Sequence, residues 1–355
     1  MKCAIYPYSD DLYVLLKHQE NIIDDIKICV AIYPRSWEKQ LFHKSDIGKV
    51  ILGTDFECLT SDVECVVFAD IKEREYMYSD ILEKAEYSLM NGRDVIFCMN
   101  IDKKDESNLR NNYPDRNITV KYGNTEERED TFYIHKDINC AAIGVGGLYR
   151  GLNHTVALTE ITCEFIRKKI RTATIADNAT LSLLGFYHFP NYIFESSMDI
   201  EQQVGMLNAF FKKIEGETKC DLMVVQFPDG MMKFIDSTMD AYGVKAFMLT
   251  RAVAFDYFVL GTLLEITNPK AYECIRSILS NRFNLSLDAC VFQPVNIDRS
   301  SSDEDQRILY TRNRIEEKYD QYNRLKQIMN NTVVAYYDDQ SVYEIIAEDC
   351  IQKLT

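Results

Sequence analysis

The sequence lacks a long apolar run, a paired cysteine motif and the short motifs of common hydrolytic enzymes. No stretch reaches the apolar length that a helix needs to cross a bilayer, and the first residues lack the apolar segment of a secretory signal. The 11 cysteines are scattered singly, without a C-x-x-C pair, unlike a zinc site or a disulfide framework. Neither H-E-x-x-H nor G-x-S-x-G occurs. We therefore expect a cytoplasmic protein with reduced cysteines, without a metal centre or a serine nucleophile.

Length and charge narrow the possibilities further. The 355 residues suffice for two domains, and 46% hydrophobic content supports well-filled cores. A formal charge of −15 repels nucleic-acid backbones and predicts no nucleic-acid partner. The one dense basic cluster, 167–171, falls at the end of a predicted helix, where cations complement the helix dipole; an anion-binding patch is the alternative.

The first hundred residues alternate short β-type runs with helical patterns. The clearest helix is predicted at 74–90, with apolar residues on one stripe and Gly92 just beyond its end. A strand and helix alternation of this kind is typical of a parallel sheet. Residues 101–130 are polar and charged, so we predict a Rossmann-like α/β domain at 1–125 and a second domain at 131–355.

The second domain repeats the alternation on a larger scale. Strands are predicted at 141–145, 172–176, 222–226, 257–260, 289–293 and 333–337, with helices between them. The charged segment 302–329 is predicted to be one long exposed helix. The fold class predicted here is a mostly parallel, P-loop NTPase-like α/β domain.

A glycine loop follows the first strand of this domain. Gly146 and Gly151 have the spacing of G-x-x-x-x-G-K-[ST], but Leu152 replaces the lysine and Asn153 replaces the serine or threonine that holds magnesium. Such a Walker A motif is degenerate. Backbone N–H groups in a glycine turn and at a helix start still attract phosphate.

Other side chains near this loop offer partial replacements. Gly147 adds backbone freedom, and Arg150 or His154 is a candidate for the missing positive charge. Thr155 or Asn153 is a candidate metal contact. The alternative is that the glycines only let strand and helix pack closely. If a ligand binds, we expect ATP or GTP with magnesium.

Two aspartates follow the neighbouring strands. Asp177, at the tip of the second strand, is either a magnesium-associated carboxylate or a helix cap. The strand ending at Gln226 carries a neutral amide where an acidic residue is normal. Asp229 is displaced into Pro-Asp-Gly, which is also an ordinary turn sequence.

Two later segments suggest recognition. Asn296 and Asp298 follow a late strand, where related sheets place an Asn-x-Asp element that reads a nucleobase; ordinary loop chemistry is the alternative. The segment 185–191, Gly-Phe-Tyr-His-Phe-Pro-Asn, is a dense aromatic loop. Its rings either cover the sheet end or form a docking surface.

These motifs resemble the clostridial peptide maturation system proteins. The resemblance is carried by the degenerate glycine loop, by Gly-Phe-x-x-Phe-Pro-Asn at 185–191 and by Pro-Asp-Gly-Met-Met at 228–232. It spans roughly 1–350, and the second domain is also similar to the dethiobiotin synthetase-like branch of P-loop proteins. The resemblance implies an accessory role in the maturation of a ribosomally synthesised peptide, with a precursor peptide or modifying enzyme as partner.

Three functional hypotheses follow. The first is a non-catalytic or weakly catalytic nucleotide-binding accessory protein in which loop 186–192 docks a peptide. The second is an ATP-dependent carboxylate-activating enzyme in which Arg150 replaces the lysine. The third is a structural scaffold that binds a modifying enzyme through its charged C-terminal helix. A homodimer is expected because related P-loop proteins pair across this face.

Overall fold

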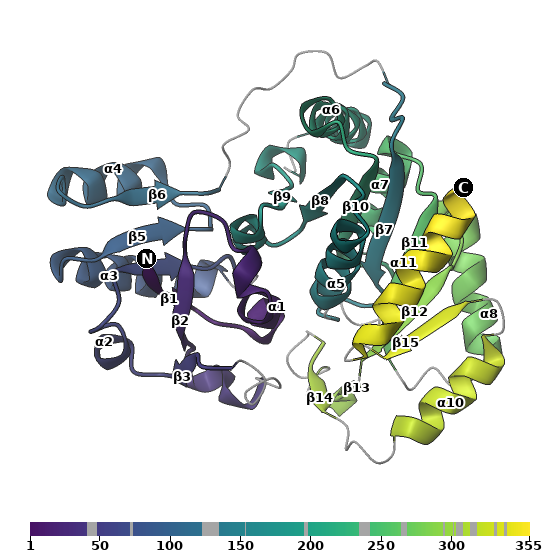
Figure 1. Ribbon diagram of the computed structural model, residues 1–355, viewed down its shortest axis with the longest axis horizontal. Helices are drawn as coiled ribbons and strands as arrows, with labels where there is room; N and C mark the ends of the chain where they lie inside the picture. Colours follow the sequence, from purple (N-terminus) through teal and green to yellow (C-terminus); the bar gives the residue numbers. More distant parts are fainter. Residues whose placement is uncertain are drawn as a thin grey trace. The chain divides into compact units, whose positions relative to one another are not determined.

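The chain forms two compact units, shown in a computed structural model in Figure 1. One unit comprises Met1–Glu126 with Asn178–Pro190, and the other comprises Glu127–Asp177 with Asn191–Thr355. The structure describes residues 1–40, 48–71, 74–122, 135–152, 154–194, 198–233, 242–263, 268–293, 295–300, 302, 308–312, 318–329, 332–336 and 339–355. Among them, no helix is long and apolar enough to span a membrane.

The first unit contains a six-stranded parallel sheet in the order β3-β2-β1-β4-β5-β6. This is the strand order of a doubly wound Rossmann sheet. The strands are β1 (Lys2–Tyr6), β2 (Lys27–Ile32), β3 (Ile51–Gly53), β4 (Cys65–Phe68), β5 (Asp94–Phe97) and β6 (Ile118–Val120). The predicted Rossmann-like fold is therefore confirmed.

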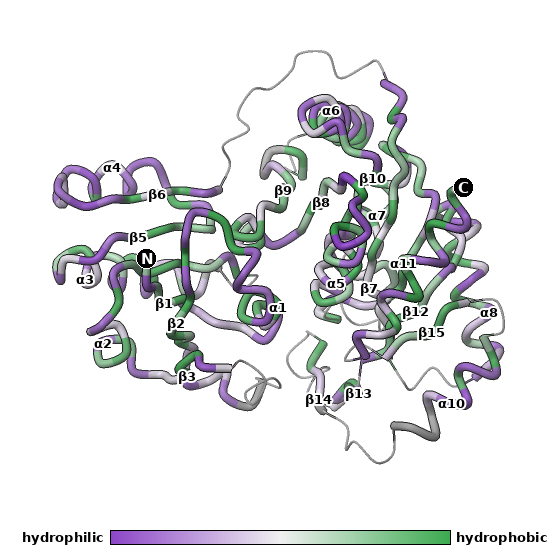
Figure 2. Tube along the Cα trace, in the orientation of Figure 1, coloured by the Kyte–Doolittle hydropathy of each residue, from purple (hydrophilic) through white to green (hydrophobic). Residues whose placement is uncertain are grey.

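The helices of this unit follow the expected amphipathic patterns. They are α1 (Tyr13–Lys17), α2 (Phe56–Leu59), α3 (Arg74–Met90) and α4 (Lys103–Asn112), with 3-10 turns at Asp10–Leu12, Gln19–Asn21 and Arg35–Gln40. Helix α3 has the predicted bounds and buries Ile81, Ala85 and Leu89. Gly92 follows with φ +83°, a conformation that glycine adopts without strain. Figure 2 shows that α4 is hydrophilic along most of its length.

The sheet of the second unit is parallel and runs in the order β15-β12-β11-β7-β10-β8. Its strands are β7 (Ala141–Gly147), β8 (Thr172–Ala176), β10 (Leu222–Gly230), β11 (Tyr257–Leu263), β12 (Ala289–Gln293) and β15 (Val333–Tyr336). A separate antiparallel hairpin joins β13 (Val295–Ile297) to β14 (Tyr310–Arg312). Taken in chain order, the strands run 6-5-4-1-3-2, so the predicted P-loop NTPase-like fold is confirmed.

Helices cover both faces of this sheet. They are α5 (His154–Arg167), α6 (Ile200–Thr218), α7 (Val244–Ala252), α8 (Pro269–Ile278), α10 (Lys318–Ile328) and α11 (Gln340–Leu354), with shorter turns at Asn191–Phe194 and Leu279–Phe283. Helices α5 and α11 pack together on one face, and α6 packs beside α7 (Figure 1). Tyr272 and Ile275 of α8 line one small cavity together with Leu260 of β11 and Cys290 of β12.

The prediction of one long helix at 302–329 was wrong. Within the described residues, Lys318–Ile328 is helical, whereas Tyr310–Arg312 forms a strand opposite Val295–Ile297. Local charge and helix propensity favoured a continuous helix. Pairing with a strand distant in sequence overrides that preference, as tertiary contacts often do.

The segment Asn178–Pro190 is anchored on the first unit. The backbone N–H of Asp70 donates to Thr180 Oγ1 at 2.7 Å, and the Asp70 carboxylate accepts from the backbone N–H of Ala179 at 3.2 Å. The 3-10 turn of this segment, Ala179–Leu184, also contacts α1, so the segment lies near the carboxyl ends of β1 and β4. A Rossmann sheet of this order binds its dinucleotide at that place. The protein's own chain occupies it here.

The aromatic loop belongs to the same segment. His188, in the short strand β9 (Tyr187–His188), stacks on Tyr122 with ring centroids 5.0 Å apart. Burial lowers the pKa of His188, and Phe189 is also buried. Of the two sequence interpretations of this loop, the described rings therefore favour packing over an exposed docking surface.

The first prediction concerns this anchor. Thr180→Val removes a buried hydroxyl and leaves the Asp70 N–H without its acceptor, so we expect a loss of about 1–3 kcal/mol in the free energy of unfolding. Urea unfolding measures it. The control is Thr250→Val, whose half-buried hydroxyl donates to Phe247 O at 2.9 Å. The control should change stability by less than about 0.5 kcal/mol; equal losses would contradict the assigned anchor.

Candidate functional site

The candidate site lies at the carboxyl end of the central strand β7. Strands β10 and β11 flank β7. The strands β8 and β10 lie on one side of β7 and the later strands β11, β12 and β15 on the other, so the direction of strand addition reverses at β7. Doubly wound sheets bind ligands at such a switch point, outside the carboxyl ends of the strands. The loop 148–152 leaves β7 there, and α5 begins at His154. The fold therefore places the glycine loop where a ligand is expected.

Most glycines of this motif allow close packing. A Cβ atom on Gly144 would lie 2.8 Å from the Phe258 ring and 2.9 Å from the Phe227 ring, and one on Gly146 would lie 2.8 Å from Met231 Sδ. A Cβ atom on Gly147 would lie 3.0 Å from His154 Nδ1. Gly151 differs, because its φ of +81° lies in the left-handed region. The packing interpretation thus accounts for Gly146 and Gly147, while Gly151 shapes the loop.

The residues at the lysine position and the helix start face inward. Leu152 is buried, and so is His154. The His154 ring lies between two carbonyl oxygens, with Nδ1 2.6 Å from Leu152 O and Nε2 3.1 Å from Phe227 O. These contacts tie the loop to β10. They make His154 a structural clamp.

The Gln226 amide bridges two of the predicted site residues, Thr155 and Asp177. Gln226 Nε2 donates to Thr155 Oγ1 at 3.0 Å, and Gln226 Oε1 accepts the backbone N–H of Asp177 at 2.9 Å. Gln226 and Thr155 are buried, and Asp177 is half-buried. The turn after β8 is capped by Asn178, whose side chain accepts from Thr180 N. Asp177 is therefore not the cap that the sequence offered as an alternative.

Two cations surround Asp229. Its carboxylate lies 2.9 Å from Lys245 Nζ and 3.8 Å from Arg150 Nε. Asp229 has φ +62° at the irregular end of β10, where the register with β7 shifts before Gly230. Asp229 is mostly shielded, whereas half of the Arg150 side chain is exposed. The cluster carries one net positive charge next to the glycine loop.

The hairpin β13–β14 reaches the same loop. Tyr310 OH donates to the carbonyl oxygen of Arg150 at 2.6 Å, and the Tyr310 ring would lie 3.1 Å from a Cβ atom on Gly151. Tyr310 pairs with Ile297, between Asn296 and Asp298. The structure thereby brings the predicted Asn-x-Asp element and the glycine loop into one neighbourhood.

The structure joins most of the predicted site residues and adds two. Arg150, Asp229 and the β13–β14 hairpin converge on the loop, whereas Asn153 lies outside the described residues. Sequence reasoning missed Lys245 and Tyr310. Neither lies in a recognisable motif, since their roles arise only from contacts between distant segments. In the described residues, no group of three or more histidine, cysteine or acidic side chains is arranged to hold a metal.

The comparisons with known proteins support the fold alone. No family model matches the chain, and no curated protein matches its sequence. The structure is similar to that of a DUF1611 family protein from Anabaena variabilis, with TM-score 0.63 and 12% identity over 99% of each chain. The comparison with chloroplast FtsY from Physcomitrella patens gives TM-score 0.34 and 11% identity, covering 79% of this chain and 89% of FtsY. The DUF1611 family protein therefore shares the α/β fold of this chain over nearly its full length.

The second prediction tests the close approach of β10 to the loop. A Cβ atom on Gly230 would lie 2.4 Å from Arg150 N and 2.8 Å from Tyr149 C, both backbone atoms that move only with the loop. We expect Gly230→Ala to cost at least about 1–3 kcal/mol of stability by urea unfolding.

The matched control is a glycine in open space. Nothing lies within 4 Å of a Cβ atom on Gly216 in α6, so Gly216→Ala should be neutral or stabilise by up to about 1 kcal/mol. A Gly230→Ala protein as stable as the wild type would show that the loop does not need this contact.

Proposed function

We propose that the second unit binds a nucleotide such as ATP or GTP at the glycine loop and hydrolyses it weakly or not at all. The observation that carries this proposal is the hydrogen bond from Tyr310 to Arg150 O. It brings an Asn-x-Asp hairpin, suited to a base, against a loop suited to phosphate. Arg150 and Lys245 supply positive charge beside that loop.

The weak catalysis follows from the residues that replace the usual machinery. An ammonium group and a carboxylate normally stabilise the transferring phosphoryl and its magnesium. Leu152 stands at the lysine position, and Gln226 is hydrogen-bonded to Thr155 and to the Asp177 backbone. A neutral amide holds magnesium far less well than a carboxylate, since magnesium prefers charged oxygen ligands.

The proposed biological role is that of a cytoplasmic accessory protein in the maturation of a ribosomally synthesised peptide. Support comes from the motifs at 185–191 and 228–232. The second contains Gly230, which approaches the backbone of Arg150, and Met232, whose N–H donates to Leu148 O. The partner would be a precursor peptide or its modifying enzyme, and a homodimer belongs to the same proposal. Sedimentation of the protein alone tests the homodimer, and sedimentation with a cysteine-rich candidate precursor peptide tests the partner, because each association raises the mass of the particle.

The second candidate is an ATP-dependent carboxylate-activating enzyme. The half-exposed guanidinium of Arg150 favours this candidate, because Arg150 belongs to the glycine loop and carries a positive charge there. Phosphate release stimulated by a carboxylate substrate, and lost in Arg150→Ala, would support this candidate. A scaffold role is separable, since it requires partner binding through α10 without nucleotide.

The third prediction concerns nucleotide affinity. By calorimetric titration we expect ATP or GTP to bind with Kd below about 1 mM. Lys245→Gln should weaken binding about tenfold, because one of two cations is lost from the site. Arg251→Gln is the control, on the same helix but exposed and stacked on Phe247. No binding at millimolar nucleotide, or equal weakening by both variants, would overturn the proposal.

The fourth prediction concerns magnesium. Because Gln226 is neutral, chelation of magnesium should change nucleotide affinity less than about twofold in the wild type. Gln226→Glu restores an acidic residue at the end of the strand and should make binding depend on magnesium. Titrations with EDTA and with excess magnesium measure this. A strong magnesium requirement in the wild type would contradict the assigned role of Gln226.

A further inference from the structure

Two cysteines lie close together at the amino ends of β7 and β10, opposite the carboxyl ends that carry the glycine loop. Cys140 immediately precedes β7, and Cys220 is separated from β10 by Asp221 alone. These strands are neighbours, with Ala141 opposite Leu222. Seven residues of β7 separate this edge from the glycine loop, a distance of about 20 Å. The pair is therefore distinct from the candidate nucleotide site.

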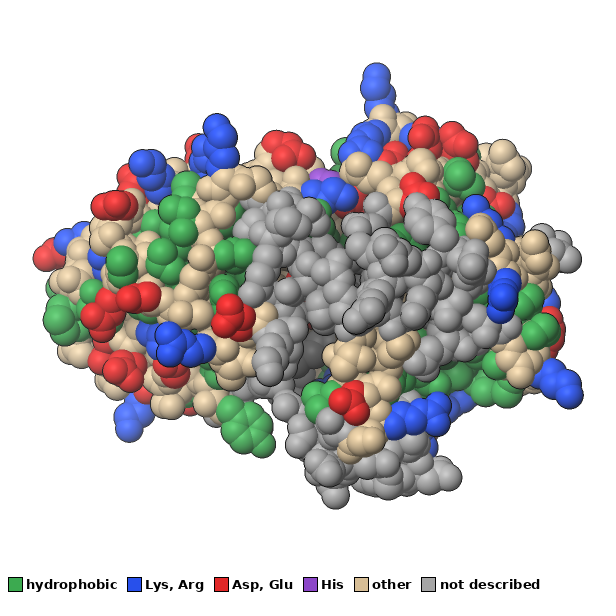
Figure 3. Space-filling model, turned by 90° about the horizontal axis from the view of Figure 1, so that it is seen from below, with side chains coloured by type: hydrophobic (Ala, Val, Ile, Leu, Met, Phe, Trp, Pro, Cys, Tyr) green, Lys and Arg blue, Asp and Glu red, His purple; other side chains and the backbone are tan. Residues whose placement is uncertain are grey.

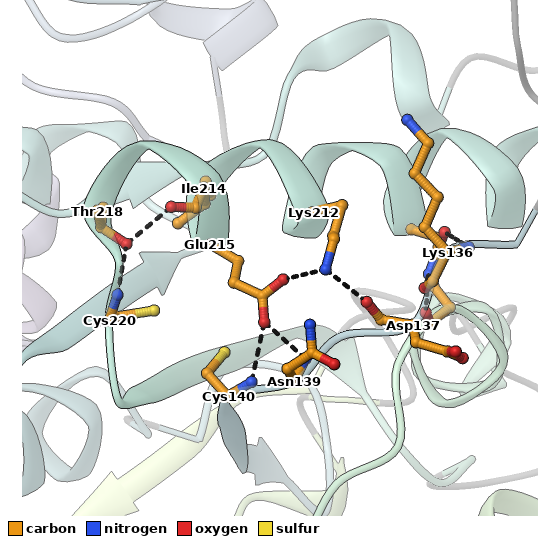
Figure 4. Close-up of polar contacts among 11 residues, drawn as sticks. Lys136, Asp137, Asn139, Cys140, Lys212, Ile214, Glu215, Thr218 and Cys220 are labelled. Atoms are coloured by element: carbon orange, nitrogen blue, oxygen red, sulfur yellow. Dashed lines mark hydrogen bonds and ion pairs between the residues drawn. The ribbon is translucent and has the colours of Figure 1, made fainter.

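The two thiols lie close to each other. In Figure 4 the sulfurs of Cys140 and Cys220 both point into the space beneath α6, and each thiol shifts the pKa of the other. Because Ala141 pairs with Leu222, Cys140 and Cys220 both lie just before the paired residues, offset by one position, with their Cα atoms roughly 6 Å apart. Side chains need not alternate between the sheet faces there, since neither cysteine is part of a strand. Disulfides commonly join Cα atoms at that separation.

Helix α6 fixes the position of both cysteines. Glu215 Oε1 accepts the backbone N–H groups of Asn139 at 2.6 Å and Cys140 at 2.9 Å (Figure 4). Lys212 donates to Glu215 and, at 2.7 Å, to Asp137 O. Cys220 follows directly on Lys219, the C-cap of α6, whose φ is +50°. One end of α6 thus holds the two thiols in place.

The thiols differ in character. The neighbouring Cys140 thiol lowers the pKa of the Cys220 thiol, although burial opposes this shift, and the Cys220 thiol in turn raises the pKa of Cys140. Glu215 repels a thiolate at either sulfur. The Arg171 guanidinium, paired with Asp221, attracts one at Cys220. This arrangement favours Cys220 as the nucleophile and Cys140 as the resolving thiol.

The first unit contains a second pair of neighbouring cysteines, which is fully buried. Cys3 lies directly opposite Cys65 on β1 and β4, and both are fully buried at 0% exposure. Cys140 is half-buried and follows the exposed Asn139, while Cys220 retains 8% exposure. Reagents in solution therefore have access to one pair only.

We propose that Cys140 and Cys220 form a redox-active dithiol, which a low-molecular-weight disulfide oxidises to an intramolecular disulfide. The Cys220 thiolate attacks one sulfur of the reagent, breaks its S–S bond and releases a thiolate that takes a proton from water. Cys140 then loses its proton and attacks Cys220 Sγ, expelling the second thiolate, which is protonated in turn. Two cysteine thiols lose two electrons, and one disulfide becomes two thiols.

The test uses the full chain with its other accessible cysteines replaced, as Cys29→Ser, Cys58→Ser and Cys274→Ser. The protein is incubated with oxidised glutathione, alkylated, digested and analysed by mass spectrometry. We expect a linked Cys140–Cys220 peptide that forms at least tenfold faster than any Cys3–Cys65 link and disappears on reduction. Equal rates for the two pairs, or thiols that stay reduced in the folded protein, would overturn the proposal.

A single substitution separates the two steps. Cys140→Ser removes the resolving thiol, so glutathione should remain attached to Cys220 as a mixed disulfide. If that variant does not fold, Cys140→Ala provides the same readout. The cross-linking experiment with the protein that keeps both Cys140 and Cys220 tests disulfide formation independently of these variants. A Cys140→Ser protein in which Cys220 takes up no glutathione would contradict the assigned nucleophile.

Discussion

Close packing against the glycine-rich strand β7 is the constraint on which the second unit depends. The Phe227 and Phe258 rings approach Gly144 so closely that a Cβ atom there would lie within 3 Å of both. Phe227 is on β10 and Phe258 on β11, so the two neighbours of β7 meet over its missing side chains. Any larger residue would force these strands apart, since interiors are packed without spare volume. The position of the loop after Gly147 follows from this packing.

The same packing explains how a P-loop-like fold persists without its usual chemistry. The loop is held by His154 between Leu152 O and Phe227 O, and by the Gln226 amide between Thr155 and Asp177. Internal contacts thus satisfy these buried ring nitrogens, carbonyl oxygens, hydroxyl and amide groups without a ligand. Buried polar groups must find partners somewhere. The protein supplies its own at the catalytic positions and keeps Arg150 and Lys245 at the edge.

The sequence predicted what depends on local pattern. Helix α3 was predicted from its apolar stripe, because burial of one helix face leaves a periodic pattern in the sequence. The strands were predicted from short continuous apolar runs, which are typical of strands buried on both faces. Three features leave no such trace: β14, the placement of Asn178–Pro190 with the first unit, and Lys245 beside Asp229. Each depends on a contact between segments far apart in the chain. Scattered single cysteines likewise gave no sign that Cys140 and Cys220 meet.

The two proposed sites share β7 and β10 but are chemically separable. The glycine loop depends on the carboxyl ends of these strands, where Gly230 opposite Gly147 allows the backbone of the loop to approach. The dithiol depends on their amino ends and on α6. Cys140 and Cys220 precede the first paired residues, Ala141 and Leu222, so a disulfide between them leaves the register of β7 and β10 unchanged. Oxidation at the amino ends of the strands is therefore compatible with an unchanged glycine loop at their carboxyl ends. Thiol oxidation and nucleotide binding can accordingly be measured independently of each other.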